Sequence, residues 1–310
     1  MEHKFVGRSG LRVSVVGLGC NNFGQRCDLA QTRAVVAKAL DLGITLFDTA
    51  DVYGGQGVSE EYLGKALEGR RADVIVATKF GMPMGEGLKR GGSRRWVMQA
   101  AENSLRRLGT DFIDLYQIHT PDPHTPIEET LRALDDLVRQ GKVRYIGCSN
   151  FAAWQVVEAA WTSRSANLAP FVSAQNFYNL LERNVERELV PACNAYGLGV
   201  LPYFPLASGL LTGKYRRGEA APEGTRLAVP RFKSALSDKN FDRVEKLAAF
   251  AADAGHSLLE LAIGWLASQP HVSSVIAGAT KPEQVEQNAR AGEWRLTPAE
   301  LVKLNELAAA

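Results

Sequence analysis

The chain has 310 residues, 45% of them hydrophobic and 23% charged, and its formal net charge is only +2. This composition is ordinary for a globular protein with a large core, and so small a charge gives no reason to expect a nucleic-acid partner or an anionic membrane surface. No apolar stretch approaches the roughly 18 residues of a membrane span. The charged start Met1-Glu2-His3-Lys4 argues against a secretory signal, and the four scattered cysteines form no CxxC pair. We expect a cytoplasmic protein without a metal site.

Short β-branched runs alternate with longer amphipathic segments along the chain. A hairpin comes first, with strands at Lys4–Val6 and Leu11–Val13. Eight further strands are predicted at Val15–Leu18, Ile44–Phe47, Val74–Thr78, Phe112–Ile118, Val143–Cys148, Phe171–Ala174, Gly199–Pro202 and Ser274–Ile276. Helices are predicted at Thr32–Leu42, Ser59–Leu67 (with Ser59 as N-cap), Arg94–Leu108, Ile127–Arg139, Ala152–Trp161, Val185–Tyr196, Asp238–Ala254, Leu258–Ser268 and Pro282–Ala291.

This alternation predicts a parallel sheet, because each parallel connection needs a crossover. A doubly wound open sheet is the rival, and it would normally show a GxGxxG after its first strand. Here the first strand ends in Gly17-Leu18-Gly19-Cys20-Asn21-Asn22, which lacks the third glycine. We therefore predict an α/β protein with one (β/α)8 TIM-barrel domain over residues 1–310, an N-terminal β-hairpin and a two-helix insertion before the eighth strand.

Polar side chains interrupt the apolar pattern where three successive predicted strands end. They are Asp48, Lys79 and His119, and Tyr53 follows shortly after Asp48. Each alone has an ordinary explanation, as a turn cap, a lysine reaching solvent or a hydrogen-bonded histidine. In a closed barrel, however, the carboxyl ends of the strands converge, and the active sites of such barrels lie there.

An aspartate, a lysine and a phenol brought together form an acid–base unit. A phenol has an ordinary pKa of about 10, and a neighbouring ammonium lowers it. We expect Lys79 to bring the pKa of Tyr53 down to roughly 7–8, and Asp48 to keep Lys79 protonated and in place. Tyr53 would then be a general acid, while His119 would donate a hydrogen bond to a substrate oxygen.

The sequence as a whole resembles the aldo-keto reductase superfamily from the first barrel strand almost to the C-terminus. The matching stretches are Gly17-Leu18-Gly19, Phe47–Gly54, Ser59–Gly64, Ala77-Thr78-Lys79, Ile118-His119, Gly141–Asn150, Gln175–Arg183, Pro205-Leu206, Gly209–Lys214 and Gln284–Asn288. The two-helix insertion and the loop Cys20–Gly24 are similar to the bacterial branch, which is related to the channel-β-subunit-like and long-loop reductases.

This resemblance implies an oxidoreductase that reduces an aldehyde or ketone to an alcohol, with NADPH preferred over NADH. It assigns the catalytic roles to Asp48, Tyr53, Lys79 and His119. Within the cofactor set, Ser149, Asn150 and Gln175 would hold the nicotinamide carboxamide, Tyr203 would stack on its ring, and Lys281 would face the 2′-phosphate. The full expected set is Gly19, Cys20, Asn21, Asp48, Ser149, Asn150, Gln175, Tyr203, Phe204, Pro205, Leu206, Ser208, Gly209, Lys214, Gly278, Thr280, Lys281, Gln284, Gln287 and Asn288.

Two further expectations concern loops. The run Ser208–Leu236 is too long for a passive connection, and the resemblance implies that it folds over the bound cofactor. The substrate pocket is expected at Asn22, Phe23, Tyr53 and His119, with the loops Met82–Arg95 and Pro121–Thr125 as its walls.

Two other functions remain open from the sequence. The first is a cofactor-sensing binding module like the potassium-channel β subunits, a branch that, by the resemblance, lacks the histidine found here as His119. The second is a Schiff-base barrel enzyme with Lys79 as nucleophile. As partners we expect a small carbonyl substrate, no nucleic acid and no membrane, with a monomer favoured over an oligomer.

Overall fold

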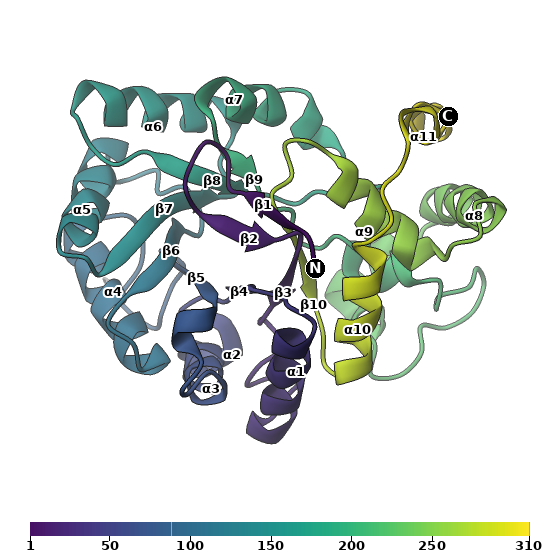
Figure 1. Cartoon of the computed structure of the whole chain (residues 1–310), viewed down its shortest axis with the longest axis horizontal. Coiled ribbons are helices and arrows are strands. Elements are labelled where there is room, and N and C mark those ends of the chain that lie inside the picture. The colour runs from purple at the N-terminus through teal and green to yellow at the C-terminus, as the bar shows by residue number, and fades with distance from the viewer. Residues whose placement is uncertain (88, 310) are drawn as a thin grey trace.

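An eight-stranded parallel sheet forms the centre of the molecule. The structure is a computed structural model and describes residues 1–87 and 89–309. The strands are β3 Val16–Gly19, β4 Leu46–Asp48, β5 Ile75–Phe80, β6 Ile113–Ile118, β7 Val143–Ser149, β8 Phe171–Gln175, β9 Gly199–Val200 and β10 Val275–Gly278. They lie side by side in the order β10-β3-β4-β5-β6-β7-β8-β9 (Figure 1). Each predicted barrel strand is present, with ends shifted by a few residues.

The sheet curls until its two edge strands meet. The parallel bridge between Val200 and Val272 joins β9 to the segment that leads into β10, and the Ile276 N–H donates to the Pro202 carbonyl at 3.2 Å. Together with the alternating helices, this closure makes the (β/α)8 barrel that the sequence predicted.

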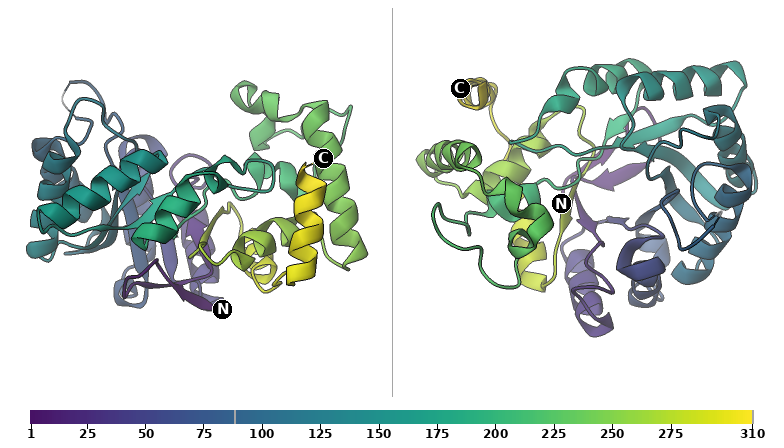
Figure 2. Two further views of the ribbon diagram at one scale, coloured as in Figure 1. Left: turned by 90° about the horizontal axis from the view of Figure 1, so that it is seen from above. Right: turned by 180° about the vertical axis from the view of Figure 1, so that it is seen from behind.

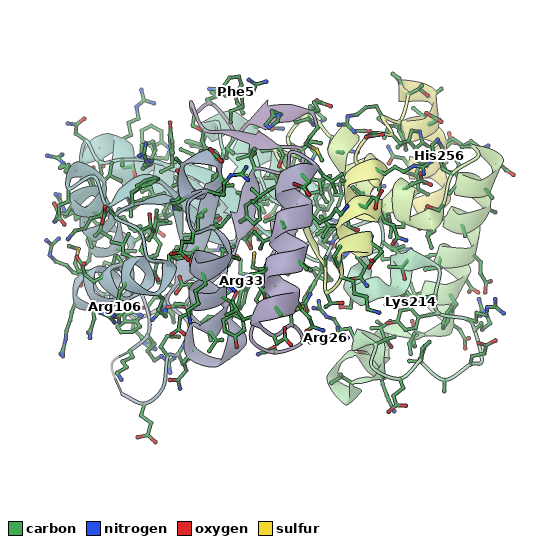
Figure 3. The ribbon with its side chains drawn as sticks, turned by 60° about the horizontal axis from the view of Figure 1, so that its bottom comes forward. Phe5, Arg26, Arg33, Arg106, Lys214 and His256 are labelled. Carbon is green, nitrogen blue, oxygen red and sulfur yellow. The ribbon has the colours of Figure 1, made fainter. Side chains whose placement is uncertain are left out.

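The N-terminal hairpin closes one end of this barrel. Its strands are β1 His3–Phe5 and β2 Arg12–Ser14, and the Ser14 N–H donates to Thr45 Oγ1, just before β4 begins. Apolar residues of the hairpin and of the barrel interior form one buried cluster: Val6, Leu11, Val13, Leu46, Ala77, Leu115, Leu201 and Ile276. In Figure 3, Phe5 of the hairpin and Arg26 lie at opposite ends of the barrel. The hairpin therefore covers the N-terminal end and leaves the C-terminal end for a site.

Helices surround the sheet. They are α1 Leu29–Asp41, α2 Tyr53–Gln56, α3 Val58–Ala66, α4 Arg94–Leu108, α5 Ile127–Arg139, α6 Ala153–Ser165, α7 Leu189–Tyr196, α8 Asp238–Asp253, α9 Leu258–Ser268, α10 Pro282–Ala291 and α11 Pro298–Ala309. Their apolar faces and the outer side of the sheet share one continuous core. The inserted helix α8 lies at the periphery against α11, away from α4 and α5 (Figures 1 and 2). No helix in the described ranges has the length and apolar character of a membrane span.

Three local predictions were wrong or incomplete. Ser59 does not cap α3, because the N-cap is Gly57 and the Ser59 hydroxyl is buried and donates to the Cys20 carbonyl at 2.8 Å. The predicted helix Val185–Tyr196 is a 3₁₀ turn at Asn184–Glu186 followed by α7. Pro191 explains that break, since a proline cannot donate to the carbonyl four residues earlier and its ring crowds that position. Helices α2 and α11 were not predicted.

Candidate active site

A cleft of about 810 Å³ opens at the C-terminal ends of the strands. Every residue expected to hold the cofactor lines it. Those at strand ends are Gly19, Cys20, Asn21, Asp48, Ser149, Asn150 and Gln175; those after β9 are Tyr203, Phe204, Pro205, Leu206, Ser208, Gly209 and Lys214; those around β10 and α10 are Gly278, Thr280, Lys281, Gln284, Gln287 and Asn288. Tyr53 and His119 line the same cleft, whereas Lys79 lies beneath its floor with no exposed surface.

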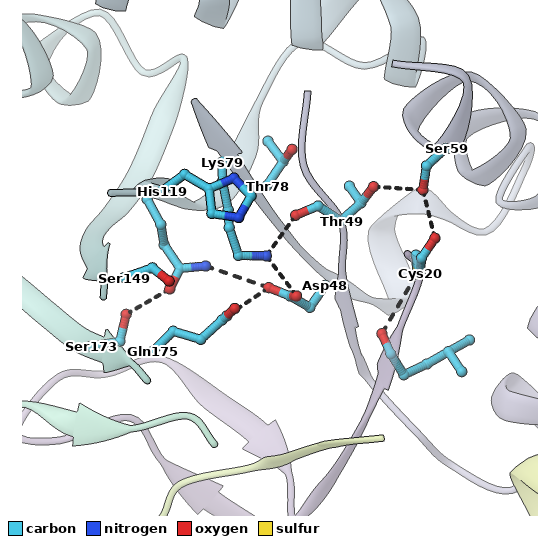
Figure 4. Close-up of polar contacts among 12 residues, drawn as sticks. Cys20, Asp48, Thr49, Ser59, Thr78, Lys79, His119, Ser149, Ser173 and Gln175 are labelled. Carbon is cyan, nitrogen blue, oxygen red and sulfur yellow. Dashed lines mark hydrogen bonds and ion pairs between the residues drawn. The ribbon is translucent and has the colours of Figure 1, made fainter. Parts of the chain in front are cut away.

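Lys79 forms a buried ion pair with Asp48, which lines the cleft (Figure 4). Strand β5 alternates, so that Ala77 and Lys79 point into the barrel while Val76 and Thr78 face the helices. The Lys79 ammonium donates to Asp48 Oδ2 at 2.7 Å and to the Thr49 carbonyl at 2.9 Å. Burial disfavours its charge, but the Asp48 carboxylate raises the pKa of Lys79 above its ordinary value. The predicted pairing of these two side chains is present.

Two glutamines complete the surroundings of Asp48. Gln175 Nε2 donates to Asp48 Oδ1 at 2.9 Å, and Gln117 Nε2 lies 3.5 Å from the same oxygen. Gln117 comes from β6, where its register partner is Lys79. Sequence reasoning missed Gln117, although its polar side chain in an apolar strand was the signal. Gln175 was expected to bind the nicotinamide, and its amide is already engaged with Asp48.

Tyr53 stands beside this ion pair at the start of α2. The Lys79 ammonium lies 5.2 Å from the centre of its ring, and the ring meets that of His119 edge-on at 5.7 Å. Burial raises the pKa of Tyr53 above its ordinary value, against the opposing effect of Lys79. The predicted fall in this pKa is therefore wrong for this structure, because desolvation of the phenolate outweighs attraction by the ammonium.

His119 follows β6 directly, and its backbone N–H donates to the Phe80 carbonyl at 2.8 Å. Its ring is largely buried, and Nδ1 has no partner among the described residues. Burial, and then the nearby Lys79 charge, lowers the pKa of His119 to about 3. The imidazole is therefore neutral at physiological pH and carries one N–H that can donate into the cleft.

Two stacked aromatic rings, Tyr203 and Phe177, lie just beyond the C-terminal end of β9. Tyr203 stacks on Phe177 with 5.7 Å between ring centres and 20° between planes, and its hydroxyl donates to Asn150 Oδ1 at 2.7 Å. The Asn150 amide donates to the His119 carbonyl at 2.9 Å. One face of Tyr203 thus packs on Phe177, a residue that sequence reasoning missed. The hydrogen bonds of Asn150 connect Tyr203 to His119.

Away from Tyr53 the cleft is lined by four cationic side chains, Arg26, Lys214, Arg226 and Lys281, and by one carboxylate, Glu223. The other carboxylate of the cleft, Asp48, is paired with Lys79 beside Tyr53. Lys281 is exposed and precedes α10, which begins at Pro282, and the unpaired N–H groups of such a helix start attract anions. This part of the cleft suits phosphate groups.

The segment expected to form a lid, Ser208–Leu236, has short 3₁₀ turns and no longer helix or strand. The turns are Ala207–Thr212, which begins one residue earlier, Arg226–Ala228 and Pro230–Ala235. Arg26, before α1, donates to the Gly224 carbonyl across the cleft. Within the segment, Arg217 forms ion pairs with carboxylates of α8. Sequence reasoning missed Arg26 and the lining residues 223–226.

The expected substrate pocket needs correction. Phe23 does not line the cleft; it is fully buried in the core. Asn22 lines the cleft, but its amide donates to the Ala279 carbonyl at 3.2 Å, two residues before Lys281. Of the described residues in the loops 82–95 and 121–125, none lines the cleft. Tyr53 and His119 remain as the expected substrate contacts.

The site agrees with what the chain is similar to. The family model for the aldo/keto reductase family matches residues 15–309. A probable voltage-gated potassium channel subunit beta of Oryza sativa subsp. japonica is 40% identical, over 94% of this chain and 91% of that one. An uncharacterised oxidoreductase of Bacillus subtilis is 38% identical, over 99% and 96%. The L-glyceraldehyde 3-phosphate reductase of Escherichia coli (strain K12) is 35% identical, over 94% and 87%. The chain belongs to the aldo/keto reductase family of oxidoreductases, whose members use nicotinamide cofactors.

Proposed function

We propose that this chain reduces an aldehyde or ketone to an alcohol with NADPH, and that Tyr53 donates the proton. The observation that supports this most strongly is the buried Lys79–Asp48 ion pair beside the Tyr53 phenol. A phenol next to a fixed ammonium can give up its proton at moderate cost, because the positive charge stabilises the phenolate that remains.

The cleft residues fit an NADPH molecule. Arg26, Lys214, Arg226 and Lys281 line the cleft and would offset the charges of the pyrophosphate and the 2′-phosphate. Tyr203 would stack on the nicotinamide, and Ser149, Asn150 and Gln175 would hold its carboxamide, with Asn150 and Gln175 exchanging their present partners. When bound, the reduced nicotinamide supplies a hydride to the carbonyl carbon.

The chain's own residues supply the proton and the orientation. Burial keeps the proton on Tyr53 at neutral pH. As the substrate oxygen gains charge, the Tyr53 O–H bond breaks, its proton goes to that oxygen, and the phenolate remains beside Lys79. Neutral His119 donates an N–H to the same oxygen and orients the carbonyl. Lys79 acts through its charge: it is protonated and buried, which argues against the alternative in which it attacks a carbonyl as a neutral amine.

The test is oxidation of NADPH in the presence of a panel of aldehydes and ketones. The panel includes a phosphorylated aldehyde, because one relative is named for reducing such a compound. We expect steady turnover with at least one member and its loss in Lys79→Met. Absence of turnover across the panel, with NADPH bound, would contradict the proposal.

A second candidate is a binding module whose cofactor reports to a partner protein. It is favoured by the names of two relatives, which are probable channel subunits at 40% and 36% identity. His119 favours the catalytic function, because a neutral imidazole in the cleft can donate a hydrogen bond to the reacting oxygen. Tight NADPH binding without turnover would support this second function.

A further inference from the structure

Asp51 lies two residues before Tyr53, and its carboxyl group is buried without a partner. The residue is 1% exposed, and neither side-chain oxygen makes a hydrogen bond within the part of the chain that the structure describes. Its backbone N–H donates to the Lys79 carbonyl at 3.0 Å, which ties the Tyr53 turn to β5. A buried, unpartnered carboxylate is costly, so the charge state of this group matters.

The charge of this carboxyl group is affected by an ion cluster of Glu60 and Arg107 between the sheet and the helices α3 and α4. Glu60 of α3 has no exposed surface and accepts hydrogen bonds from Arg107 Nε at 2.7 Å and from Thr78 Oγ1 at 2.5 Å. Arg107 comes from α4, so it joins the two helices through Glu60. The guanidinium is already paired with Glu60 and makes no ion pair with Asp51.

Among residues 1–87 and 89–309, no charged or titratable group near Asp51 neutralises its charge. Glu60 from α3 repels its charge, Arg107 from α4 is held by Glu60, Lys79 from β5 is bound to Asp48, and the Tyr116 hydroxyl from β6 has no partner among the described residues. Burial first and Glu60 second raise the pKa of Asp51 to about 8, against the weaker opposing effects of Arg107, the adjacent Val52 backbone N–H and Lys79. The group is neutral at pH 7 and becomes charged as the pH rises through about 8.

The turn from Tyr53 to α3 depends on the same cluster. Residues 54–57 all have positive φ, between 67° and 98°, and Gln56 among them is not a glycine. The three glycines adopt positive φ without steric cost, which makes this turn easy to deform, whereas Gln56 is strained and must be held by packing. A Cβ on Gly57 would lie 2.4 Å from Arg107 Nε, which shows that the guanidinium packs directly against the turn.

We propose that the proton on Asp51 holds the Tyr53 turn against the barrel, and that its loss at alkaline pH loosens the turn and withdraws the proton donor. Asp51 is thus a positioning residue. The ionised Asp51 carboxylate would repel Glu60, attract Arg107 away from Glu60 and require water. The turn at residues 54–57 is the segment that would move to admit this water. The consequence for catalysis rests on the proposed role of Tyr53, whereas the loosening of the turn does not.

The test combines two measurements on the full chain between pH 6 and pH 10. The first is kcat against pH for the wild type and for Asp51→Asn, whose neutral amide copies the protonated acid. We expect kcat of the wild type to fall about tenfold per pH unit above about pH 8, and the alkaline limb of Asp51→Asn to lie at least one pH unit higher. The second is amide hydrogen exchange of residues 50–58, relative to helix α5 in the same sample. It should rise above pH 8 in the wild type and stay level in Asp51→Asn.

Asp114→Asn is the matched control. Asp114 is buried to a similar degree, but it is paired with Arg71 at 2.6 Å and accepts from the Val76 N–H at 3.0 Å. Its replacement should leave the alkaline limb in place. The proposal would be overturned if kcat fell at the same alkaline pH in the wild type and in Asp51→Asn. It would also be overturned if exchange of residues 50–58 in the wild type, relative to helix α5, did not change with pH. The exchange measurement on the wild type needs neither turnover nor a variant, so it separates this proposal from the proposed function.

Discussion

The Lys79–Asp48 pair should dominate the stability of the barrel's catalytic end, and a double-mutant cycle measures how much. In Asp48→Asn the Lys79 ammonium stays fully buried with only neutral oxygens around it, including the Thr49 carbonyl at 2.9 Å. Leaving one buried charge unpaired costs about 3–5 kcal/mol of unfolding free energy. In Lys79→Met the Asp48 carboxylate still accepts hydrogen bonds from the amides of Gln175 and Gln117. The loss of unfolding free energy in this variant should therefore lie near the lower end of that range.

Removing both charges should cost less than removing either one. The double variant Asp48→Asn/Lys79→Met leaves no buried ion, and replacing such a pair by neutral groups is often close to neutral for stability. We expect its unfolding free energy within about 2 kcal/mol of the wild type, and thus a coupling of at least about 3 kcal/mol. The assay is urea unfolding of the four proteins without cofactor. Additive losses, with the double variant the least stable, would refute the reasoning.

Four further predictions concern the residues of the cleft. Lys281→Ala should weaken NADPH binding about 10- to 100-fold, as loss of a hydrogen bond to a charged group would, and leave NADH binding nearly unchanged; equal losses in titration of both cofactors would refute its assignment to the 2′-phosphate. NADPH should protect the segment Ser208–Leu236 from limited proteolysis, and unchanged cleavage would mean that the segment does not cover the cofactor. His119→Ala should lower turnover about 100-fold with NADPH affinity retained. The pKa of His119 is about 3 in the folded protein and 6.5 as its ordinary value, so between these values the unfolded chain binds a proton that the folded protein does not. The contribution of neutral His119 to the unfolding free energy is therefore complete above pH 6.5 and declines as the pH falls toward 3. Acid unfolding of the wild type and of His119→Ala checks this dependence.

The convergence of Asp48, Lys79 and His119 was predictable because each interrupts the apolar pattern where a strand ends. In a parallel barrel, Asp48, Lys79 and His119 must meet once the strands are correctly identified, and the structure brings them together. The energetic balance at Tyr53 was not predictable. The sequence supplies its charged neighbour but not its degree of burial, and burial decides the direction of its pKa.

The covering residues were not predictable for a different reason. Arg26 and Gly224 are about two hundred positions apart, and their contact depends on how the lid segment folds back over the cleft. The assignment of Phe23 failed because a large apolar residue in a loop can face either the cleft or the core, and sequence spacing does not distinguish the two. Here Phe23 packs into the core.

The most direct test of the central claim is the single-turnover rate of carbonyl reduction by Tyr53→Phe with NADPH saturating. The substitution removes only the hydroxyl and keeps the ring between Lys79 and His119. A positioned general acid contributes about 100- to 10,000-fold, so the rate should fall by at least 100-fold while NADPH affinity and fold are retained. Tyr62→Phe, which removes a hydroxyl from α3 outside the cleft, serves as the control and should react at the wild-type rate. A Tyr53→Phe enzyme that keeps most of its single-turnover rate would contradict the account.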